Sequence, residues 1–321
     1  MSPTRPAFED VIRARERIKA YLPRTPLSTY PRLNRLLGAE VNVKREDVLP
    51  TSAFKVRGGI NLVSSLTDEE RGRGLICSST GNHGQSIADA CRLAGAPCPV
   101  VVPNGASPLK VEAMQALGAT VEFYGDVFDD SLAHAGREAK ERGLYFVHSA
   151  DEPLLIAGVA TAALEVLEEV PDLDYYFVPL GGGSGAAGAC TVLKAKRQEA
   201  KVIAVQSASA PGGFLSWQGR ALTEAPATTM AEGLSTRAGY ELPQTILWEQ
   251  LDDFLLAEDA ELERAIVHYL DCAHLVAEHA GAAPLAGALQ VRERIAGKKV
   301  VLVLSGANMT LEQIRNALLR A

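Results

Sequence analysis

Short apolar runs alternate with amphipathic segments along most of the chain. A first set of apolar runs lies at residues 75–79, 99–103, 120–125 and 145–149. A second set lies at residues 175–180, 201–206, 252–257 and 299–305. Between these runs, apolar residues recur at helical spacing, as in SIADACRLAG, SPLKVEAMQALG and SLAHAGREAKERG. This alternation of strands and helices is typical of α/β proteins with parallel sheets.

The two sets of apolar runs predict two subdomains, each a parallel sheet between two layers of helices. The first set predicts a smaller inserted domain at residues 65–150. The second set, joined by the segment 41–47, predicts a larger domain formed by residues 1–64 and 151–321. Ligands of parallel sheets bind outside the carboxyl ends of the strands. We therefore expect functional residues to follow the strands and to face a cleft between the two domains.

Composition restricts the class of protein further. The chain has 321 residues, 22% charged and 47% hydrophobic, and its formal net charge of −7 comes from acids and bases that are mixed along the sequence. Nucleic acids and membrane surfaces select clustered Lys and Arg, so neither is an expected partner. No uninterrupted apolar stretch reaches the roughly 18 residues of a membrane span. The five cysteines form no CxxC pair, which predicts reduced thiols, a cytoplasmic location and no zinc site.

The segment TSAFKVRGG, residues 51–59, places a lysine beside paired glycines. We expect Thr51 or Ser52 to cap a helix that contains Lys55. An exposed helix would not need Gly58 and Gly59, since each costs about 1 kcal/mol relative to alanine. A lysine in a dry cleft tends to lose its proton, and the neutral amine forms Schiff bases with carbonyl compounds. An ordinary solvated helix lysine is the alternative for this segment taken alone.

The segment PLGGGSGAAGA follows the run at 175–180 and opens a helix. Successive glycines let backbone N–H groups converge on one anion at the positive end of a helix, which predicts a phosphate site. Gly183, Gly185 and Gly188 also fit GxGxxG, so a dinucleotide-dependent oxidoreductase using NAD is an alternative. That alternative requires an acidic residue at the end of the next strand, where this chain has Gln206. A single phosphate on a smaller cofactor fits better.

Two further polar segments follow predicted strands. In SSTGNHGQS, residues 78–86, hydroxyl, amide and imidazole side chains gather at a helix start, an arrangement that suits a carboxylate. In LSGANMT, residues 304–310, Ser305 would present a hydroxyl from a strand end and Asn308 would brace the turn. A strand-terminating turn explains the second segment equally well.

These segments together resemble the threonine/serine dehydratase and serine racemase family. The set TSAFKVRGG, SSTGNHGQS, PLGGGSGAAG and LSGANMT has the family's order and spacing over nearly the whole chain, and KRED at 44–47 also resembles it. The resemblance implies a fold-type II (tryptophan synthase β-like) enzyme that uses pyridoxal 5'-phosphate, with the cofactor between the two domains. It also implies a small amino acid as substrate and a homodimer as assembly.

The resemblance assigns roles to individual residues. Lys55 would hold the cofactor by a Schiff base and take the Cα proton of the substrate, Phe54 would pack beside the ring, Asn82 would bond the ring's 3-oxygen, and Ser305 would face the ring nitrogen. The phosphate loop would be Gly181, Gly182, Gly183, Ser184 and Gly185. The loop for the substrate carboxylate would be Ser79, Thr80, Gly81 and His83.

The implied activity is that of an ammonia-lyase, which converts threonine or serine to a 2-oxo acid and ammonia by β-elimination. A neutral Ser305 makes the ring a weaker electron sink, which favours loss of a β-hydroxyl group. Dehydration of 3-hydroxyaspartate is an alternative, with Arg237 a candidate partner for the second carboxylate. Serine racemisation is another alternative, although Thr80 stands where racemase-like members carry serine. A binding protein that keeps the fold without catalysis is a further alternative.

Some members of this family bind a divalent cation after the strand that corresponds to residues 201–206. Two acidic side chains and a carbonyl serve as ligands there, and this chain has Gln206, Ala210 and Gly212 at those positions. Hard cations prefer anionic oxygen ligands. We therefore expect no metal site.

Overall fold

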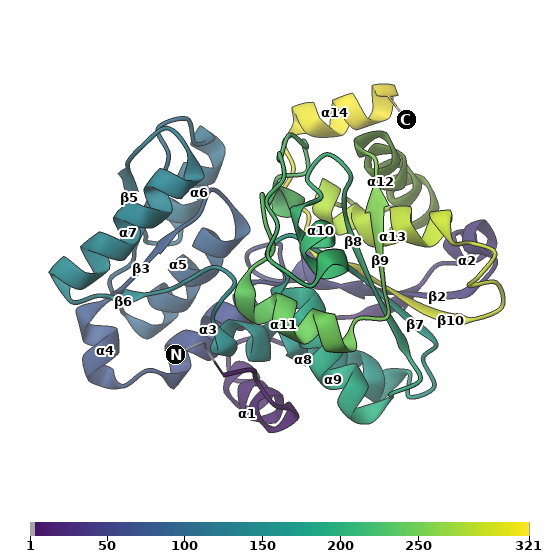
Figure 1. Ribbon diagram of the computed structural model, residues 1–321, viewed down its shortest axis with the longest axis horizontal. Coiled ribbons are helices and arrows are strands. Elements are labelled where there is room, and N and C mark those ends of the chain that lie inside the picture. Colours follow the sequence, from purple (N-terminus) through teal and green to yellow (C-terminus); the bar gives the residue numbers. More distant parts are fainter. Residues whose placement is uncertain (1–3, 321) are drawn as a thin grey trace.

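The computed structural model describes residues 4–320, and these residues form two sheets (Figure 1). The strands of the larger sheet follow the order β1 (Leu27–Thr29), β2 (Glu40–Arg45), β10 (Lys299–Leu304), β7 (Tyr175–Pro179), β8 (Lys201–Ser207) and β9 (Asp253–Ala257). Those of the smaller sheet follow the order β5 (Thr120–Phe123), β4 (Pro99–Val102), β3 (Leu75–Ser78) and β6 (Tyr145–Phe146). Neighbouring strands are parallel, except that β1 runs antiparallel to β2.

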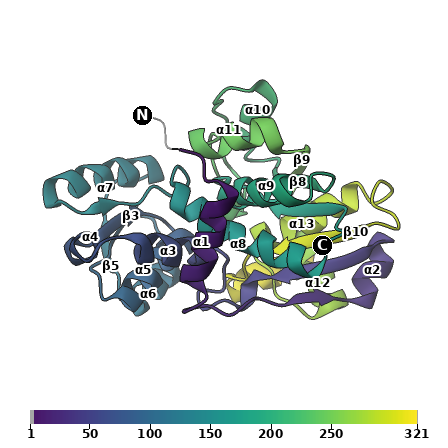
Figure 2. The ribbon, with the colours of Figure 1, turned by 90° about the horizontal axis from the view of Figure 1, so that it is seen from below.

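Helices surround both sheets (Figures 1 and 2). They are α1 (Phe8–Ile18), α2 (Pro31–Leu37), α3 (Val56–Ser65), α4 (Asp68–Arg73), α5 (Asn82–Ala94), α6 (Pro108–Ala116), α7 (Phe128–Arg142), α8 (Pro153–Glu169), α9 (Ser184–Lys196), α10 (Gly212–Gly219), α11 (Glu241–Gln250), α12 (Asp259–Ala273), α13 (His279–Gln290) and α14 (Leu311–Arg320), with short 3-10 turns η1 (Glu46–Val48) and η2 (Glu232–Leu234). Each predicted apolar run contains a strand, and the three quoted helical patterns form α5, α6 and α7. The predicted α/β fold is confirmed.

Helices cover both faces of the larger sheet. Successive residues of each strand point to opposite faces, so they pack into different cores. Phe177 and Leu302 pack into a core with α12 and α13. Their neighbours Tyr176 and Val301 pack into a second core with α8 and α9 on the other face. Alternate residues of a continuous apolar run such as KVVLVL therefore pack against two different helix layers.

The smaller sheet shares its core with helices outside residues 65–150. On one face, Val101 packs against α7. On the other face, Cys77 and Val100 belong to a core that includes α5 and α6 and continues into α1, α3 and α8. We propose domain boundaries near residues 64 and 151, as the sequence predicts, with α3 serving both domains.

Paired glycines allow α3 to approach two helices closely. A Cβ at Gly58 would lie 3.0 Å from the backbone oxygen of Leu155 in α8. A Cβ at Gly59 would lie 2.5 Å from Oγ of Ser86 in α5, closer than real Cβ contacts. Because they lack side chains, the glycines after Lys55 therefore allow α3, α5 and α8 to approach one another closely.

A buried ionic cluster anchors the start of α3 to β2 and α8. Arg57, which is 1% exposed, donates to both Glu46 and Glu165. Lys44 donates to Glu165 and to the backbone oxygen of Thr25. Each buried charge thus has an opposite charge and hydrogen bonds, as burial requires. The KRED segment at 44–47 supplies two of these charges to the base of the helix that follows Lys55.

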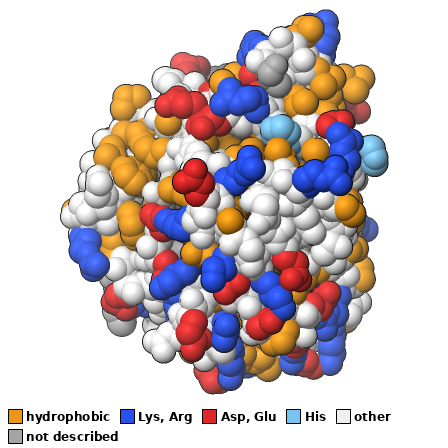
Figure 3. Space-filling model, turned by 90° about the vertical axis from the view of Figure 1, so that its right-hand side faces the viewer, with side chains coloured by type: hydrophobic (Ala, Val, Ile, Leu, Met, Phe, Trp, Pro, Cys, Tyr) orange, Lys and Arg blue, Asp and Glu red, His pale blue; other side chains and the backbone are white. Residues whose placement is uncertain are grey.

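The structure also shows the lengths of the helices and the distribution of charge on one face. None of the helices between residues 4 and 320 is long and apolar enough to cross a bilayer. On the face shown in Figure 3, basic and acidic side chains are interspersed. This distribution agrees with the mixed charges of the sequence.

Candidate active site

A pocket of about 600 Å³ opens between the two domains. The loop after β3 contributes to one wall, and residues between Met230 and Tyr240 contribute to the other. A volume of this size suits a cofactor or small-molecule ligand. The residues predicted from sequence that line this pocket are Lys55, Ser79, Thr80, Gly81, Asn82, His83, Gly182, Arg237 and Asn308.

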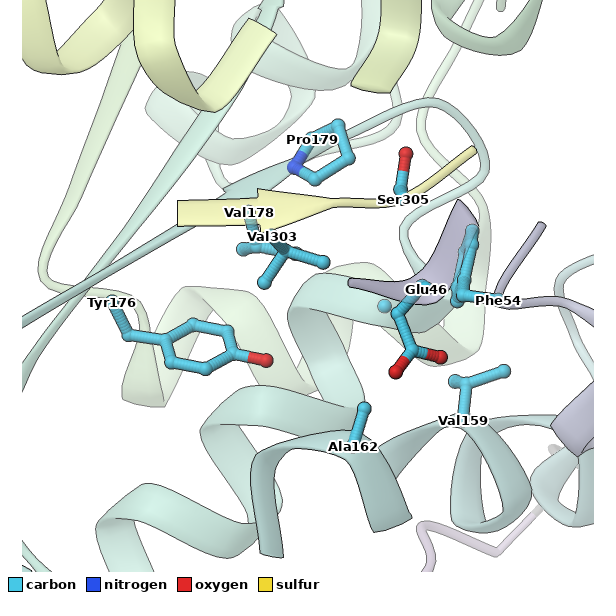
Figure 4. Close-up of a pocket in the computed structure, with 10 residues that line it drawn as sticks. Glu46, Phe54, Val159, Ala162, Tyr176, Val178, Pro179, Val303 and Ser305 are labelled. Atoms are coloured by element: carbon cyan, nitrogen blue, oxygen red, sulfur yellow. The ribbon is translucent and has the colours of Figure 1, made fainter. Parts of the chain in front are cut away.

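Other predicted residues line a second, much smaller cavity of about 10 Å³ (Figure 4). Phe54, Gly185 and Ser305 border this cavity, and Glu46 and Tyr176 border it as well. The last three predicted residues, Gly181, Gly183 and Ser184, border neither space and form the turn that leads into α9.

Lys55 lies immediately before α3, which begins at Val56. The predicted cap at Thr51 or Ser52 is wrong: Thr51 donates to the backbone oxygen of Ala53, and Ser52 has a φ of 50°. Ala53 instead pairs with Gly306 in an isolated β-bridge, which ties this turn-rich segment to the chain just after the strand end at 304. The helix therefore starts only after the lysine.

Burial lowers the pKa of the Lys55 amine from 10.5 to about 8, and the nearby Glu278 limits this effect. At pH 7 about a tenth of the amine is then neutral, far more than for an ordinary lysine, as the sequence predicts for a Schiff-base lysine. The backbone oxygen of Lys55 accepts a hydrogen bond of 2.6 Å from Ser86 in α5. Lys55 is thereby fixed to the same helix whose start faces the pocket.

The turn before α9 combines a helix start with close packing. Gly183 immediately precedes the helix with a φ of 90°, which favours glycine. A Cβ at Gly183 would lie 2.8 Å from Pro243, and a Cβ at Gly181 would lie 2.1 Å from the backbone oxygen of Gly233. Packing alone thus requires two of these glycines. The first-turn N–H groups of α9 have no intrahelical acceptors, so the predicted phosphate site stays a chemically reasonable prediction.

The loop after β3 presents the start of α5 to the pocket. Ser79 Oγ accepts hydrogen bonds from the N–H groups of Gly81 and Gly84, at 3.1 and 2.9 Å, and so braces the loop. Asn82 is the first helical residue, and because the N–H of Gly84 is already bonded to Ser79, the N–H groups of Asn82 and His83 are those available to an anion. Burial lowers the pKa of His83 to about 3, with Lys55 adding to the effect, so its imidazole is neutral.

Asn82 is held by two side chains from distant parts of the chain. Its Nδ2 donates to Glu278 at 2.8 Å, and its Oδ1 accepts from Asn308 at 2.7 Å. Asn308 also donates to the backbone oxygen of Thr51. These partners fix which end of the Asn82 amide is the donor, and they leave one N–H of Nδ2 for a ligand. Asn308 thus ties its turn to the segment before α3 and orients Asn82; that it braces its own turn stays a prediction.

Glu278 is a candidate functional residue that the sequence reasoning missed. It immediately precedes α13 and lines the large pocket. Burial raises the pKa of its carboxyl from 4.5 to about 7, against the lowering effects of the Asn82 hydrogen bond and of Lys110. A Glu directly before the small-residue helix HAGAAPLAG was the available signal, but it is equally typical of a helix cap.

Two ion pairs span the mouth of the large pocket. Lys110 of α6 pairs with Glu232 of η2. Arg237, whose side chain is 64% exposed, lies 3.5 Å from Asp129. The pairs join elements of the two domains, and their partners are more than 100 residues apart in sequence, so no local pattern could predict them.

Gln206 occupies the position that an acidic residue would need for either a dinucleotide or a cation. Its Nε2 donates to Thr236 at 3.2 Å, and its Oε1 accepts from the N–H of Phe214 at 3.0 Å. The amide therefore serves as a neutral brace between two segments of the chain. The expected absence of a metal stays a prediction.

Comparison with known proteins identifies the family. The family model for the pyridoxal-phosphate dependent enzymes matches residues 18–306. L-threonine ammonia-lyase of Thermotoga maritima is 34% identical over 308 residues, which cover 96% of this chain and 77% of the relative. L-threo-3-hydroxyaspartate ammonia-lyase of Saccharomyces cerevisiae is 35% identical over 309 residues, 96% of this chain and 95% of the relative.

A solved structure shows the same fold. Threonine deaminase isoform 2 from Solanum lycopersicum superimposes with a TM-score of 0.92 at 28% identity, covering 100% of this chain and 96% of that one. The family match includes Lys55, both loops and Ser305, over most of the chain. This chain therefore belongs to the family of pyridoxal-phosphate dependent enzymes.

Proposed function

We propose that this enzyme is an ammonia-lyase that dehydrates a β-hydroxy amino acid, threonine or serine first. The observation that carries the proposal is the meeting, in one pocket, of a lysine amine with a lowered pKa and a helix start that suits a carboxylate. The relatives named as L-threonine ammonia-lyase and L-threo-3-hydroxyaspartate ammonia-lyase support the reaction class.

The residues present fit pyridoxal phosphate. Its aldehyde requires an amine such as Lys55, and its phosphate requires converging N–H groups such as those of the glycine turn before α9. Its 3-oxygen would take the remaining N–H of the oriented Asn82 amide, and its ring would lie by Phe54 and Ser305. When bound, the cofactor supplies an electron sink that weakens the Cα–H bond of the substrate.

The chain's own groups would then perform the steps around the substrate. N–H groups at the start of α5 bind the α-carboxylate, which orients the Cα–H bond. Lys55, as the neutral amine, takes the Cα proton as the general base. Ser305 is neutral, so it supplies no charge that would hold a proton on the ring nitrogen. This favours expulsion of the β-hydroxyl group over a long-lived carbanion.

The overall reaction is balanced without a further reactant. The Cα–H bond breaks with its proton going to Lys55, and the Cβ–O bond breaks with its electron pair leaving on hydroxide, which takes up a proton to form water. The released enamine becomes an imine by moving one proton to Cβ. Water then hydrolyses this imine to a 2-oxo acid and ammonia.

The pocket favours an uncharged side chain on the substrate. Val127, Leu132 and Met230 give its lining apolar groups that suit the methyl group of threonine. The cations at the mouth, Lys110 and Arg237, already pair with carboxylates. A second substrate carboxylate would have to displace one of these anions, so 3-hydroxyaspartate is the second candidate. Thr80 lines the pocket and is the residue to examine for racemisation as a side activity.

A substrate panel tests the proposal. The purified protein should show the visible absorption band of lysine-bound pyridoxal phosphate, and it should release a 2-oxo acid from threonine and serine faster than from 3-hydroxyaspartate. Addition of a chelator should leave the rate unchanged. The variant Lys55→Ala should lose both the band and turnover. Turnover by that variant, or a wild-type rate that depends on a metal, would contradict this mechanism.

We also propose a homodimer and a cytoplasmic location. Cys77, Cys91, Cys98, Cys190 and Cys272 are free thiols, which supports a reducing compartment. Apolar side chains on α14 are exposed, with Leu311 at 85% and Leu319 at 76%, which supports contact with another chain. Light scattering on the eluted protein measures the mass, and a monomer at micromolar concentration would refute the dimer.

A further inference from the structure

Lys110 lies beside the start of α5, although it comes from α6. A Cβ built on Gly81, the residue before α5, would lie 3.9 Å from Nζ of Lys110. Gly81, Asn82 and Lys110 all line the large pocket. The ammonium group therefore lies close to the helix start, in the lining of the same pocket. Both are positive features that favour an anion between them.

In the described structure, the partner of this ammonium group is Glu232. The Lys110 side chain is 20% exposed, whereas the Glu232 side chain is 50% exposed. An anion stabilises a partly buried ammonium group, because burial makes its charge more costly to leave unpaired. A half-exposed carboxylate, in contrast, can return to water at little cost. The pair is thus suited to an exchange in which only Lys110 keeps a partner within the pocket.

We propose that Lys110 binds the α-carboxylate of the amino-acid substrate together with the start of α5, and that this carboxylate displaces Glu232. The inference rests on the proposed function and deepens it by naming a substrate-binding residue outside the loop 79–83. Glu232 then acts as an internal competitor that holds the ammonium group until substrate arrives. Because each state has one carboxylate on Lys110, the exchange creates no unpaired charge at this residue.

If Lys110 exchanges Glu232 for the substrate carboxylate, substitutions of Lys110 and of Glu232 should shift KM in opposite directions. If the ion pair only links the two domains, both substitutions should impair the enzyme in the same way. Under the exchange, Lys110→Met removes a charge-assisted hydrogen bond to the substrate and should raise KM for threonine at least ten-fold, with a smaller change in kcat. Glu232→Gln removes the competitor and should lower KM several-fold, since more of the enzyme is then competent to bind. The double variant should resemble Lys110→Met.

Binding of two small probes isolates the carboxylate. Alanine carries the α-carboxylate and has no leaving group, whereas alaninol has a hydroxymethyl group in place of the carboxylate. Calorimetric titration of the holoenzyme should show that Lys110→Met weakens alanine binding at least ten-fold and leaves alaninol binding within two-fold. Lys110→Arg should retain most of the alanine affinity because it keeps the charge. Lys140→Met, which removes an exposed lysine on α7 of the same domain, is the matched control.

Each outcome decides the inference. Opposite shifts in KM for the two single variants, with loss of alanine but not alaninol affinity, support it. Equal losses in both variants, or equal losses for both probes, identify a structural link between domains and overturn it. If Lys110→Met does not fold, the Glu232→Gln variant still decides, because an unchanged or raised KM overturns the exchange. If the wild-type enzyme releases no 2-oxo acid, the proposed function fails, and the two probes still test Lys110.

Discussion

At the scale of single residues, the site depends on groups whose protonation is set by burial. Lys55, His83 and Glu278 lie around one pocket, and each has a pKa shifted toward its neutral form, mainly by burial. A neutral amine is needed for a general base, and a neutral imidazole adds no charge beside it. Glu278 is the unusual member, because a carboxyl with a pKa of about 7 changes its charge near physiological pH.

The shift of Glu278 predicts a pH dependence of stability. Its pKa is raised on folding from 4.5 to about 7, so the unfolded chain releases this proton first as the pH rises. Between those two values the folded state binds more protons, and stability falls with rising pH by up to about 3 kcal/mol. Glu278→Gln removes this titration. Urea unfolding of the cofactor-free protein should show that the free energy of unfolding of the variant rises relative to that of the wild type from pH 4.5 to 7.

Above pH 7 the difference between Glu278→Gln and the wild type should stay constant. Glu70→Gln is the control: this half-exposed carboxyl in the first turn of α4 has its pKa lowered by hydrogen bonds from Thr67, so its difference should not grow over the same range. A gap between Glu278→Gln and wild type that is the same at pH 4.5 and pH 7 would show that the pKa of this carboxyl is not raised on folding.

The sequence named the lysine and the loop after β3 that line the pocket, but not the groups that orient them. Glycines, a lysine and hydroxyl residues after strands carry local chemical signals, so the loops at 79–83 and 181–185 could be located. Glu278 and Asn308 reach Asn82 from 196 and 226 residues away. Such contacts follow from the way the two domains face each other. A single sequence without that geometry does not contain them.

At the scale of elements, the packing of α3 against α5 decides where Lys55 lies. In Gly59→Ala, the new methyl group would lie 2.5 Å from Ser86 Oγ and 2.6 Å from the Ser86 backbone oxygen. Overpacking of this kind costs about 1–3 kcal/mol, and it would also disturb the hydrogen bond from Ser86 to Lys55. We expect lower stability in urea and reduced turnover together.

Gly72→Ala provides the matched comparison for Gly59→Ala. Gly72 lies in α4 and is exposed, and among the residues described no atom lies within 4 Å of the position that its new methyl group would take. This substitution should stabilise the protein by about 0.4–1 kcal/mol through the unfolded chain and leave turnover intact. If Gly59→Ala behaved in the same way, close helix approach would not be the reason for the glycine pair.

The period of the apolar residues located the parallel strands and helices, because both sheets are covered by helices. The short strand β1 was missed, since LST has only three residues, follows a proline and pairs antiparallel at the sheet edge. The predicted cap at Thr51 or Ser52 was wrong because the bridge between Ala53 and Gly306 overrides local capping preference. Tertiary pairing thus decided the boundaries that local chemistry could not.

At the scale of the whole molecule, the smaller sheet has only a small core of its own, against α7, and shares the larger core on its other face. One of its faces packs into a cluster that includes Ala14 of α1, Ile60 of α3 and Ala157 of α8. Removing the smaller domain would therefore expose apolar surface on both parts. The pocket lies between the two domains that share this core. Substitutions that loosen the shared core should therefore also disturb the pocket.

The shared core predicts that both domains unfold in one transition. The two tryptophans, Trp217 and Trp248, lie in α10 and α11 beside the larger sheet, so their fluorescence reports on that domain. Far-UV circular dichroism reports on all helices, including α5, α6 and α7. In urea the two signals should change with the same midpoint, because loss of either domain exposes the common core. A circular-dichroism change that begins at lower urea, with fluorescence still native, would show that residues 65–150 unfold independently.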